Sequence, residues 1–479
     1  MAISSIAERA VKESKAELMS RNQQLEEKKN IKLLDFYENM QISDEYLGNW
    51  GFKGEDGKDK IPLSNVNITK QIIDRISMLY KREPERKLIS KTDDKLTEDQ
   101  EAIYAQWAAF NPNYDMMLKY AERYKNLLHK VLFRMHVNPE QQNWDFFVDT
   151  YYRAHFRGFD NLHPFAYSIL MEPNAEYFEE GEQWWLFVSD EDMFFYEPNR
   201  QKRKTEFMMP DGTIVDYEGV NPYGVMNLVE LRSEPAVTKY GVSGAIDLVN
   251  SNQAINVAVN NIHVAIQYQS FGIVWQTGEI TQQRNTIKVS PFNVYVVDTG
   301  ESLNSLDLNP KLLESFESIN HHIKLIGNSY GVNINFSVEA TAVSGVSLTI
   351  QNIDLLERRE DSIDVAVNQE NEIYNKLQII QDFHKNDLSK NEPKLIKDVK
   401  VSLNFADLDF PVGLDEELKE RDWNIERNIK TPLDYMDPDL DEETKMKEFE
   451  KNKRINGQMS SIDELAQELN PEGVTPNEE

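Results

Sequence analysis

The strongest constraint on the fold is a stretch without formal charge in a chain that is otherwise rich in charges. Between Asp247 and Glu279 the sequence contains no Asp, Glu, Lys or Arg, although charged residues make up 28% of the whole chain. Apolar residues recur within this stretch at steps of seven, four, three and four, which is typical of one face of a helix. They are Leu248, Ile255, Val259, Ile262 and Ile266. The pattern predicts a long helix over about residues 244–269 with an apolar seam.

The remaining sides of this predicted helix are polar but uncharged. Their side chains are mainly amides: Asn250, Asn252, Gln253, Asn256, Asn260, Asn261, His263 and Gln267. A membrane-spanning helix is excluded, because each amide would need a partner within the hydrocarbon and no run of about 20 apolar residues exists. The helix must therefore pack against protein. Two partners stay open: other parts of the same chain, and neighbouring copies of the chain in a ring.

The residues that follow predict a stalk with a tip. Strand-like segments at 272–276 and 293–297 are separated by polar turns, and Pro310 then opens a second helix at 311–328. Residues 329–343 contain Gly331 and several Asn and Ser residues without a sustained period, which predicts a loop. A helix restarts at Ser344 and runs to about Phe383.

The N-terminal half predicts helices followed by a β-rich region. The first helix begins near residue 13, carries an apolar edge at 33–37 and ends near residue 48; the others cover 70–80, 99–110 and 114–135. Between residues 145 and 232, short aromatic runs separated by Gly and Pro predict antiparallel sheet with its aromatic side chains in the core. An alternating strand is expected at 399–405. Together these elements predict an α+β fold.

The acidic composition limits the partners of this chain. The formal net charge is −30 and the pI is about 4.7, which argues against a surface that neutralises phosphates, so any contact with DNA must be loose. The absence of cysteine excludes disulfides, thiolate metal sites and Cys nucleophiles, and is typical of assembly in a reducing cytoplasm. From Asp415 onward the chain is acidic and helix-forming, and we expect disorder after Asn470.

No catalytic, cofactor or metal site is expected. Walker A, GxGxxG, GxSxG and HExxH patterns do not occur. His321 and His322 are neighbours that would point about 100° apart on a helix, so they cannot easily share a metal ion. A calcium-loop spacing fails because Glu442 stands where the sharp turn needs glycine. Its acidic positions are Asp437, Asp439, Asp441 and Glu448.

Several local patterns accompany this order of elements. The patterns lie at residues 61–65 with 80–84, 221–224 with 228–231, 244–250, 342–348, and 431–435 with 437–439. Among them are Asn221-Pro222-Tyr223-Gly224 before the first long helix, Gly244-Ala245-Ile246-Asp247 at its start, and Ser344-Gly345 after the loop. Together with the order of the elements, these patterns resemble those of the portal proteins of tailed bacteriophages, and the resemblance covers nearly the whole chain.

The resemblance implies a portal-like subunit with wing, stem, clip and short crown. The parts would be a wing at 1–240, a stem helix at 241–270, a clip at 271–309, a second stem helix at 310–328, a tunnel loop at 329–344, a long wing helix at 345–390, a C-terminal wing and crown at 391–470, and a disordered tail at 471–479. It also implies a non-enzymatic ring of about twelve subunits at one capsid vertex of the virion, assembled in the host cytoplasm.

The implied partners are further copies of the chain, the terminase large subunit, a head–tail adaptor, and the major capsid or scaffolding protein. Duplex DNA would pass through the channel without sequence specificity, and no cofactor or membrane is involved. Tunnel-loop contacts to DNA are expected from Asn333, Asn335 and Ser337, and docking of partners to the clip from Trp275 and Tyr295. Subunit contacts in the stem are expected from the apolar seam: Leu248, Ile255, Val259, Ile262 and Ile266.

Two other functions stay open. The chain could be a different structural protein of the virion, such as a head–tail adaptor or an assembly factor. It could also be a metal-dependent nuclease that uses acidic clusters such as Asp190, Glu191 and Asp192, although no Lys or His is placed beside them to complete the chemistry.

Overall fold

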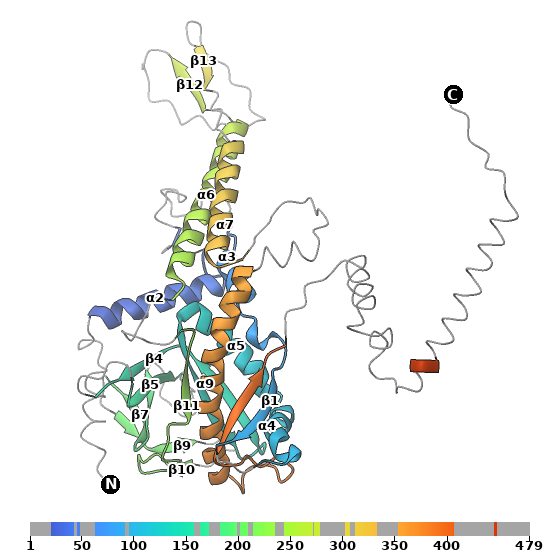
Figure 1. Ribbon diagram of the computed structural model, residues 1–479. Coiled ribbons are helices and arrows are strands. Elements are labelled where there is room, and N and C mark those ends of the chain that lie inside the picture. The colour runs from blue at the N-terminus through green and yellow to red at the C-terminus, as the bar shows by residue number, and fades with distance from the viewer. Residues whose placement is uncertain are drawn as a thin grey trace, which may run out of the picture. The chain divides into compact units, whose positions relative to one another are not determined.

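The structure is a computed structural model in which helices and antiparallel sheets are mixed, as an α+β fold requires (Figure 1). It describes residues 21–42, 46–47, 63–91, 95–157, 163–171, 183–198, 202–208, 214–234, 244–271, 273–277, 302–306, 312–332, 353–406 and 445–447. The chain divides into two units. The first comprises residues 1–338 and 352–407; the second comprises residues 339–351 and 408–479, in which residues 445–447 are helical.

The first described helix, α2 (Arg21–Tyr37), is shorter than the sequence predicts. We expected it to end near residue 48, but Asn39 adopts a left-handed conformation with φ of 69° and closes the helix. The N–H of Met40 donates to the carbonyl of Asp35, and the side chain of Gln41 donates to the carbonyl of Phe36. Asparagine tolerates this conformation better than most residues, which explains the early end.

The helix expected at residues 70–80 is divided in two. Helix α3 (Ile68–Ile76) ends where the N–H and hydroxyl of Ser77 both donate to the carbonyl of Ile73. A short 3₁₀ turn, η3 (Leu79–Lys81), follows. The carboxylate of Glu122 accepts the N–H groups of Leu79 and Tyr80 at 2.9 and 3.2 Å. A side chain from a distant helix thus satisfies the donors that a continuous helix would have satisfied itself.

Helix α4 (Glu98–Phe110) confirms the helix predicted at 99–110 and begins with a capping box between Thr97 and Gln100. The helix predicted at 114–135 is only partly correct. Helix α5 (Asn113–Leu128) ends at His129, whose φ is 70°, and strand β2 (Lys130–Asn138) follows. Val131 and Phe133 join one apolar cluster while Leu132 joins another. These three residues form a short apolar run that is buried on both faces of the strand, and such a run cannot be distinguished from a helix by its periodicity.

The β-rich region predicted at 145–232 is confirmed as antiparallel sheets. Strand β2 lies between β3 (Asn143–Asp149) and β11 (Leu228–Arg232). A five-stranded sheet follows in the order β4-β5-β6-β7-β8, and β9 pairs with β10. The bounds of these strands are β4 Tyr152–His155, β5 Ala166–Met171, β6 Trp184–Ser189, β7 Met193–Glu197, β8 Lys202–Lys204, β9 Glu206–Met208 and β10 Ile214–Asp216. The aromatic residues of β6 and β7 are buried, as the sequence predicts.

A two-stranded sheet lies beside the longest described helix, α9 (Ile353–Phe383). Strand β14 (Val399–Asn404) confirms the alternating strand predicted at 399–405, and it pairs with β1 (Glu85–Ser90), which the sequence did not indicate. Helix α9 ends at Phe383 as expected; its predicted start at residues 344–352 lies outside the described residues.

A buried ionic network fixes α9 against β1, α4 and α5. Arg86 of β1 is 3% exposed and bonds both to Glu370 of α9, at 3.1 Å, and to Asp115 of α5. The hydroxyl of Tyr104 also donates to Glu370, and the rings of Tyr104 and Tyr114 pack against the guanidinium. Glu370 is fully buried, so Arg86 and Tyr104 offset the cost of removing its carboxylate from water.

We expect Glu370→Gln to lower the free energy of unfolding by about 3 kcal/mol, because it leaves the buried Arg86 without its main counter-charge. Glu372→Gln on the same helix is the matched control, since its side chain is 53% exposed and its ion pair with Lys376 lies at the surface. Chemical denaturation of both variants provides the measurement. Equal effects of the two substitutions would show that the network does not stabilise the fold.

Candidate functional site

The helix–strand–helix order predicted for residues 244–328 is present. Helix α6 (Ile246–Phe271) and helix α7 (Leu312–Ser329) lie side by side, and the strands between them lie at the far end of the pair (Figure 1). Strand β12 (Ile273–Thr277) contains Trp275 opposite Asn304 of β13 (Ser302–Leu306). The strand predicted at 293–297, with Tyr295, lies outside the described residues.

The first turn of α6 is fixed to the end of α5. The N–H of Ala245 donates to the carbonyl of Leu127 at 2.9 Å, so a free donor before one helix meets a free acceptor at the end of another. Gly244 lies so close that an added Cβ would overlap the same carbonyl oxygen. The hydroxyl of Tyr330, just after α7, donates to Asp247 at 2.6 Å. Burial and this hydrogen bond raise the pKa of Tyr330.

One side of α6 carries a ladder of buried asparagines that bind the backbone of residues 63–69. The side chain of Asn260 accepts the N–H of Ser64 at 3.0 Å and donates to the carbonyl of Ser64 at 2.7 Å. One turn earlier, the side chain of Asn256 accepts the N–H of Val66 at 2.8 Å. An amide side chain has both a donor and an acceptor, so it can replace the hydrogen-bonding edge of a neighbouring strand.

The third asparagine, Asn252, continues this pattern where the bound segment turns into α3. Its oxygen accepts both the N–H and the hydroxyl of Thr69, at 2.9 and 3.0 Å, and its amide donates to the carbonyl of Val66 at 2.8 Å. Gln41 closes the group by accepting from the amide of Asn256. All four of these polar side chains, Gln41, Asn252, Asn256 and Thr69, are 0–1% exposed.

The spacing of the ladder follows from the geometry of the two partners. Four residues of an α-helix rise by about 6.0 Å. Two residues of an extended chain span about 6.6 Å. Asparagines at steps of four therefore keep pace with an extended chain laid along the helix. Asn260 binds Ser64, Asn256 binds Val66 two residues on, and Asn252 binds Val66 and Thr69 where the chain turns into α3. The sequence contained this signal, but we assigned these amides only to the polar sides of the helix; their structural role is to hold residues 63–69.

The apolar seam of α6 is mostly buried within the single chain. Leu248, Ile255 and Ile262 are 1–5% exposed and belong to the same apolar cluster as Ile319 and Ile323 of α7. Val259 is half-buried, and Ile266, nearer the strands, is 40% exposed. Packing inside the chain therefore accounts for most of the seam, and Ile266 is its most exposed member.

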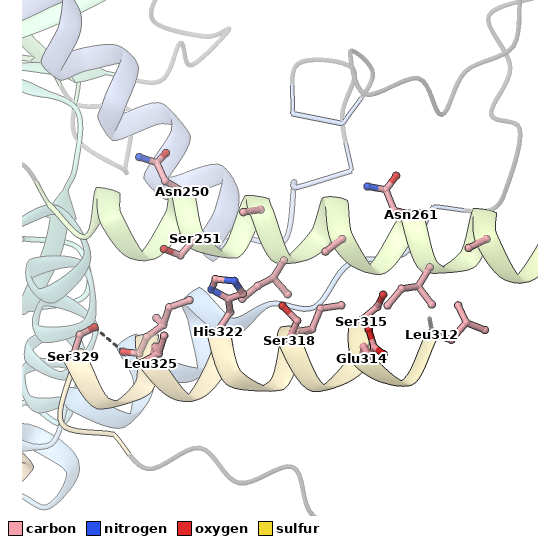
Figure 2. Close-up of a pocket in the computed structure, with 17 residues that line it drawn as sticks. Asn250, Ser251, Asn261, Leu312, Glu314, Ser315, Ser318, His322, Leu325 and Ser329 are labelled. Atoms are coloured by element: carbon pink, nitrogen blue, oxygen red, sulfur yellow. Dashed lines mark hydrogen bonds between the residues drawn. The ribbon is translucent and has the colours of Figure 1, made fainter. Parts of the chain in front are cut away.

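A groove runs along one flank of the α6–α7 pair (Figure 2). Its volume is about 1110 Å³. Small side chains from both helices, including Ala254 and Ala258 on α6 and Ser315 and Ser318 on α7, leave the space open. Figure 2 shows His322 and Leu325 of α7 pointing toward the α6 side of the same hollow.

The other flank of α7 carries exposed apolar residues. Leu313 is 73% exposed and Phe316 is 48% exposed, and neither lines the groove. At about 100° per residue they lie on the side of α7 opposite Ser318 and His322. The helix pair therefore has a hollow on one flank and protruding apolar side chains on the other. The sequence analysis did not single out Leu313 or Phe316.

The residues expected to touch DNA, Asn333, Asn335 and Ser337, lie outside the described residues. The described residues end at Val332, just after Gly331, and resume at Ile353, just before Leu355. An added Cβ on Gly331 would lie 3.2 Å from the backbone nitrogen of Leu355, so these two points are neighbours.

Neither a metal site nor a membrane span is found in the part of the chain that the structure describes. No group of three His, Asp or Glu residues there could hold a metal ion. None of the helices there is long and apolar enough to cross a membrane. No protein-family model matches the sequence, and no curated protein matches it either.

We expect Asn256→Ala to destabilise the protein by about 1–3 kcal/mol, because it removes the acceptor of the Val66 N–H and a donor to the buried oxygen of Gln41. Asn261→Ala is the matched control on the same helix, at an exposed position outside the ladder. Hydrogen exchange read by mass spectrometry should quicken in the peptide over residues 63–69 in the first variant only. Unchanged exchange there would mean that the ladder does not hold the segment.

Proposed function

We propose that this chain is the subunit of a ring-shaped portal, the channel through which DNA enters and leaves the capsid of a tailed bacteriophage. The observation that carries the proposal is the α6–α7 pair with its groove on one flank and Leu313 and Phe316 on the other. The resemblance of the sequence over nearly its whole length to portal proteins supports the same assignment. In this proposal α6 and α7 are the stem, the strands between them belong to the clip, and α9 is the long wing helix.

The two flanks favour a ring because they differ. A contact that joins unlike surfaces of identical subunits is heterologous. It repeats from copy to copy and forms a ring when the rotation between copies closes, whereas like surfaces would stop at a dimer. Leu313 and Phe316 of one copy would fill the groove of the next copy, which is lined by small side chains such as Ala254 and Ser318. Burying these apolar side chains removes exposed apolar area from water, which is the main driving force for association. Ile266 would join the contact between copies.

Electrostatics support a sliding channel in preference to a DNA-binding surface. Duplex DNA carries one negative charge per about 1.7 Å, and clustered Lys and Arg would hold it by counterion release. The chain has a formal net charge of −30, and α6 after Asp247 has no charged residue. A channel wall that is acidic or uncharged gives DNA no strong electrostatic attachment. The channel is thus proposed to pass DNA without chemistry and without sequence specificity.

The clip is proposed as the docking surface for the terminase large subunit during packaging and for a head–tail adaptor afterwards. Strands β12 and β13 lie at the end of the α6–α7 pair away from the rest of their unit (Figure 1). A small β unit in that position can change its contacts without disturbing the core. The wing is proposed to meet the major capsid or scaffolding protein, which places the assembled ring in the virion.

The assembly is tested with the double variant Leu313→Asp, Phe316→Asp. Both side chains are exposed in the single chain, so their replacement should alter the free energy of unfolding of a subunit by less than about 0.5 kcal/mol each. Two charges facing an apolar groove should nevertheless abolish ring formation, because each would be desolvated without a partner. Native mass spectrometry at micromolar concentration gives the subunit count.

The groove side is tested separately with Ala254→Trp, which fills the hollow from the exposed face of α6. This variant should also yield single subunits. Ile214→Asp is the control, because Ile214 is 53% exposed but lies on β10, away from the helix pair. Rings of normal size in both stem variants would exclude this contact, and single subunits in the unmodified protein would exclude the ring itself.

The tunnel loop and the clip should give different defects. Asn333→Lys with Asn335→Lys should leave rings intact but slow DNA packaging, because about twelve copies would each add attraction to phosphate. Trp275→Ala with Tyr295→Ala should weaken binding of the terminase while rings still form. A packaging assay and a terminase-binding assay on both variants decide the assignment. Identical defects, or normal packaging by the loop variant, would contradict it.

A further inference from the structure

A small polar cavity lies where η3, α5 and the first part of α9 meet. Its volume is about 10 Å³, which is roughly the room of one water molecule. Among the charged lining residues, Lys125, Arg358 and Arg359 are cationic and Glu122 is the one carboxylate. The lining consists of Ile76, Met78, Leu79, Glu122, Lys125, Asn126, Leu355, Arg358, Arg359 and Ser362.

The carboxylate of Glu122 already accepts hydrogen bonds from the protein backbone. Both oxygens of Glu122 accept backbone N–H groups of η3, from Leu79 and Tyr80. Glu122 is 3% exposed and Lys125 is 4% exposed. Burial raises the pKa of Glu122 and lowers the pKa of Lys125, although each partly offsets the other by its charge. One carboxylate therefore faces Lys125, Arg358 and Arg359.

Arg359 supplies the observation that points to a ligand. It is 8% exposed, and one of its terminal nitrogens donates to the carbonyl of Ala406 at 2.6 Å. Its Nε atom is buried and has no hydrogen-bond partner among the described residues. A guanidinium has N–H donors and no acceptor, so Nε can be satisfied only by a group that accepts its hydrogen bond. A buried donor without an acceptor costs about 1–3 kcal/mol, and an uncompensated charge costs more.

We propose that this cavity binds a small monovalent inorganic anion of the halide class, accepted by Arg359 Nε and balanced by Lys125. A water molecule could accept the hydrogen bond but would leave the excess of positive charge in place. An anion both accepts the hydrogen bond from Arg359 Nε and offsets the excess of positive charge. It also links α9 to α5 and η3 at the point where α9 begins. The site does not depend on ring assembly, because its lining comes from a single chain.

Thermal unfolding of the full chain in sodium chloride and in sodium gluconate, at equal ionic strength and pH, tests the site. Chloride should raise the midpoint saturably by about 2–4 °C, since a ligand that binds only the folded state stabilises it. The rise of the unfolding midpoint in chloride should become smaller at higher pH, because anion binding requires Lys125 to be protonated. Lys125→Met should abolish the chloride dependence, whereas Lys119→Met, on the same helix but outside the cavity lining, should retain it.

Crystals of the full chain grown in sodium bromide give the direct readout. An anomalous bromine peak within hydrogen-bonding distance of Arg359 Nε would support the site, and its loss in Lys125→Met crystals would tie it to the cationic pair. A water molecule in the cavity with no anomalous peak would overturn the proposal. So would a chloride dependence that is the same in both lysine variants, because the effect would then be general to the salt.

Discussion

The asparagine ladder is the interaction on which the arrangement of residues 63–69 and α6 depends. A chain segment packed against a helix normally leaves its backbone donors and acceptors without partners, and burying them is costly. Asn252, Asn256 and Asn260 remove this cost by offering an amide at every turn of the helix, and these amides bind the backbone at Thr69, Val66 and Ser64. Residues 63–69 can therefore pack against α6 without belonging to any sheet, half-buried over residues 63–67 and buried at Ile68 and Thr69.

Because the ladder occupies one side of α6 and α7 occupies another, the faces of this helix have separate roles. Leu248, Ile255 and Ile262 pack in the core of the chain. Small residues such as Ala254 and Ala258 remain on the flank where the groove lies. The lack of charge along α6 follows from the same division, since one side bonds to backbone, one packs in the core and one lines an apolar hollow. The proposed ring uses the only one of these faces that no other described segment covers.

The sequence predicted the long elements well and the junctions poorly, for physical reasons. Helices α6 and α7 were found almost to their ends, because the charge-free stretch and Pro310 mark them locally. Strand β2 was mistaken for helix because it is buried on both faces, and the division of α3 from η3 depends on Glu122, which lies far away in sequence. Strand β1 was missed because its residues, such as Arg86, are polar and gain their burial only from α9 and β14.

The candidate functional residues also differ in how far the sequence alone could predict them. The apolar seam was visible as a period, but periodicity alone could not tell packing within a chain from packing between chains. The ladder was visible as asparagines at steps of four, yet its meaning required the partner segment. Leu313 and Phe316 gave no signal, because exposure is a property of the folded chain.

The central claim is that identical chains close into a ring through unlike flanks of the α6–α7 pair. A cryo-electron microscopy reconstruction of the purified full-length protein tests it most directly. The account predicts a closed ring with a central hole wide enough for duplex DNA, in which Leu313 and Phe316 of each copy lie in the groove of the next. Single subunits, open filaments, or a ring in which the α6–α7 groove faces solvent would contradict it.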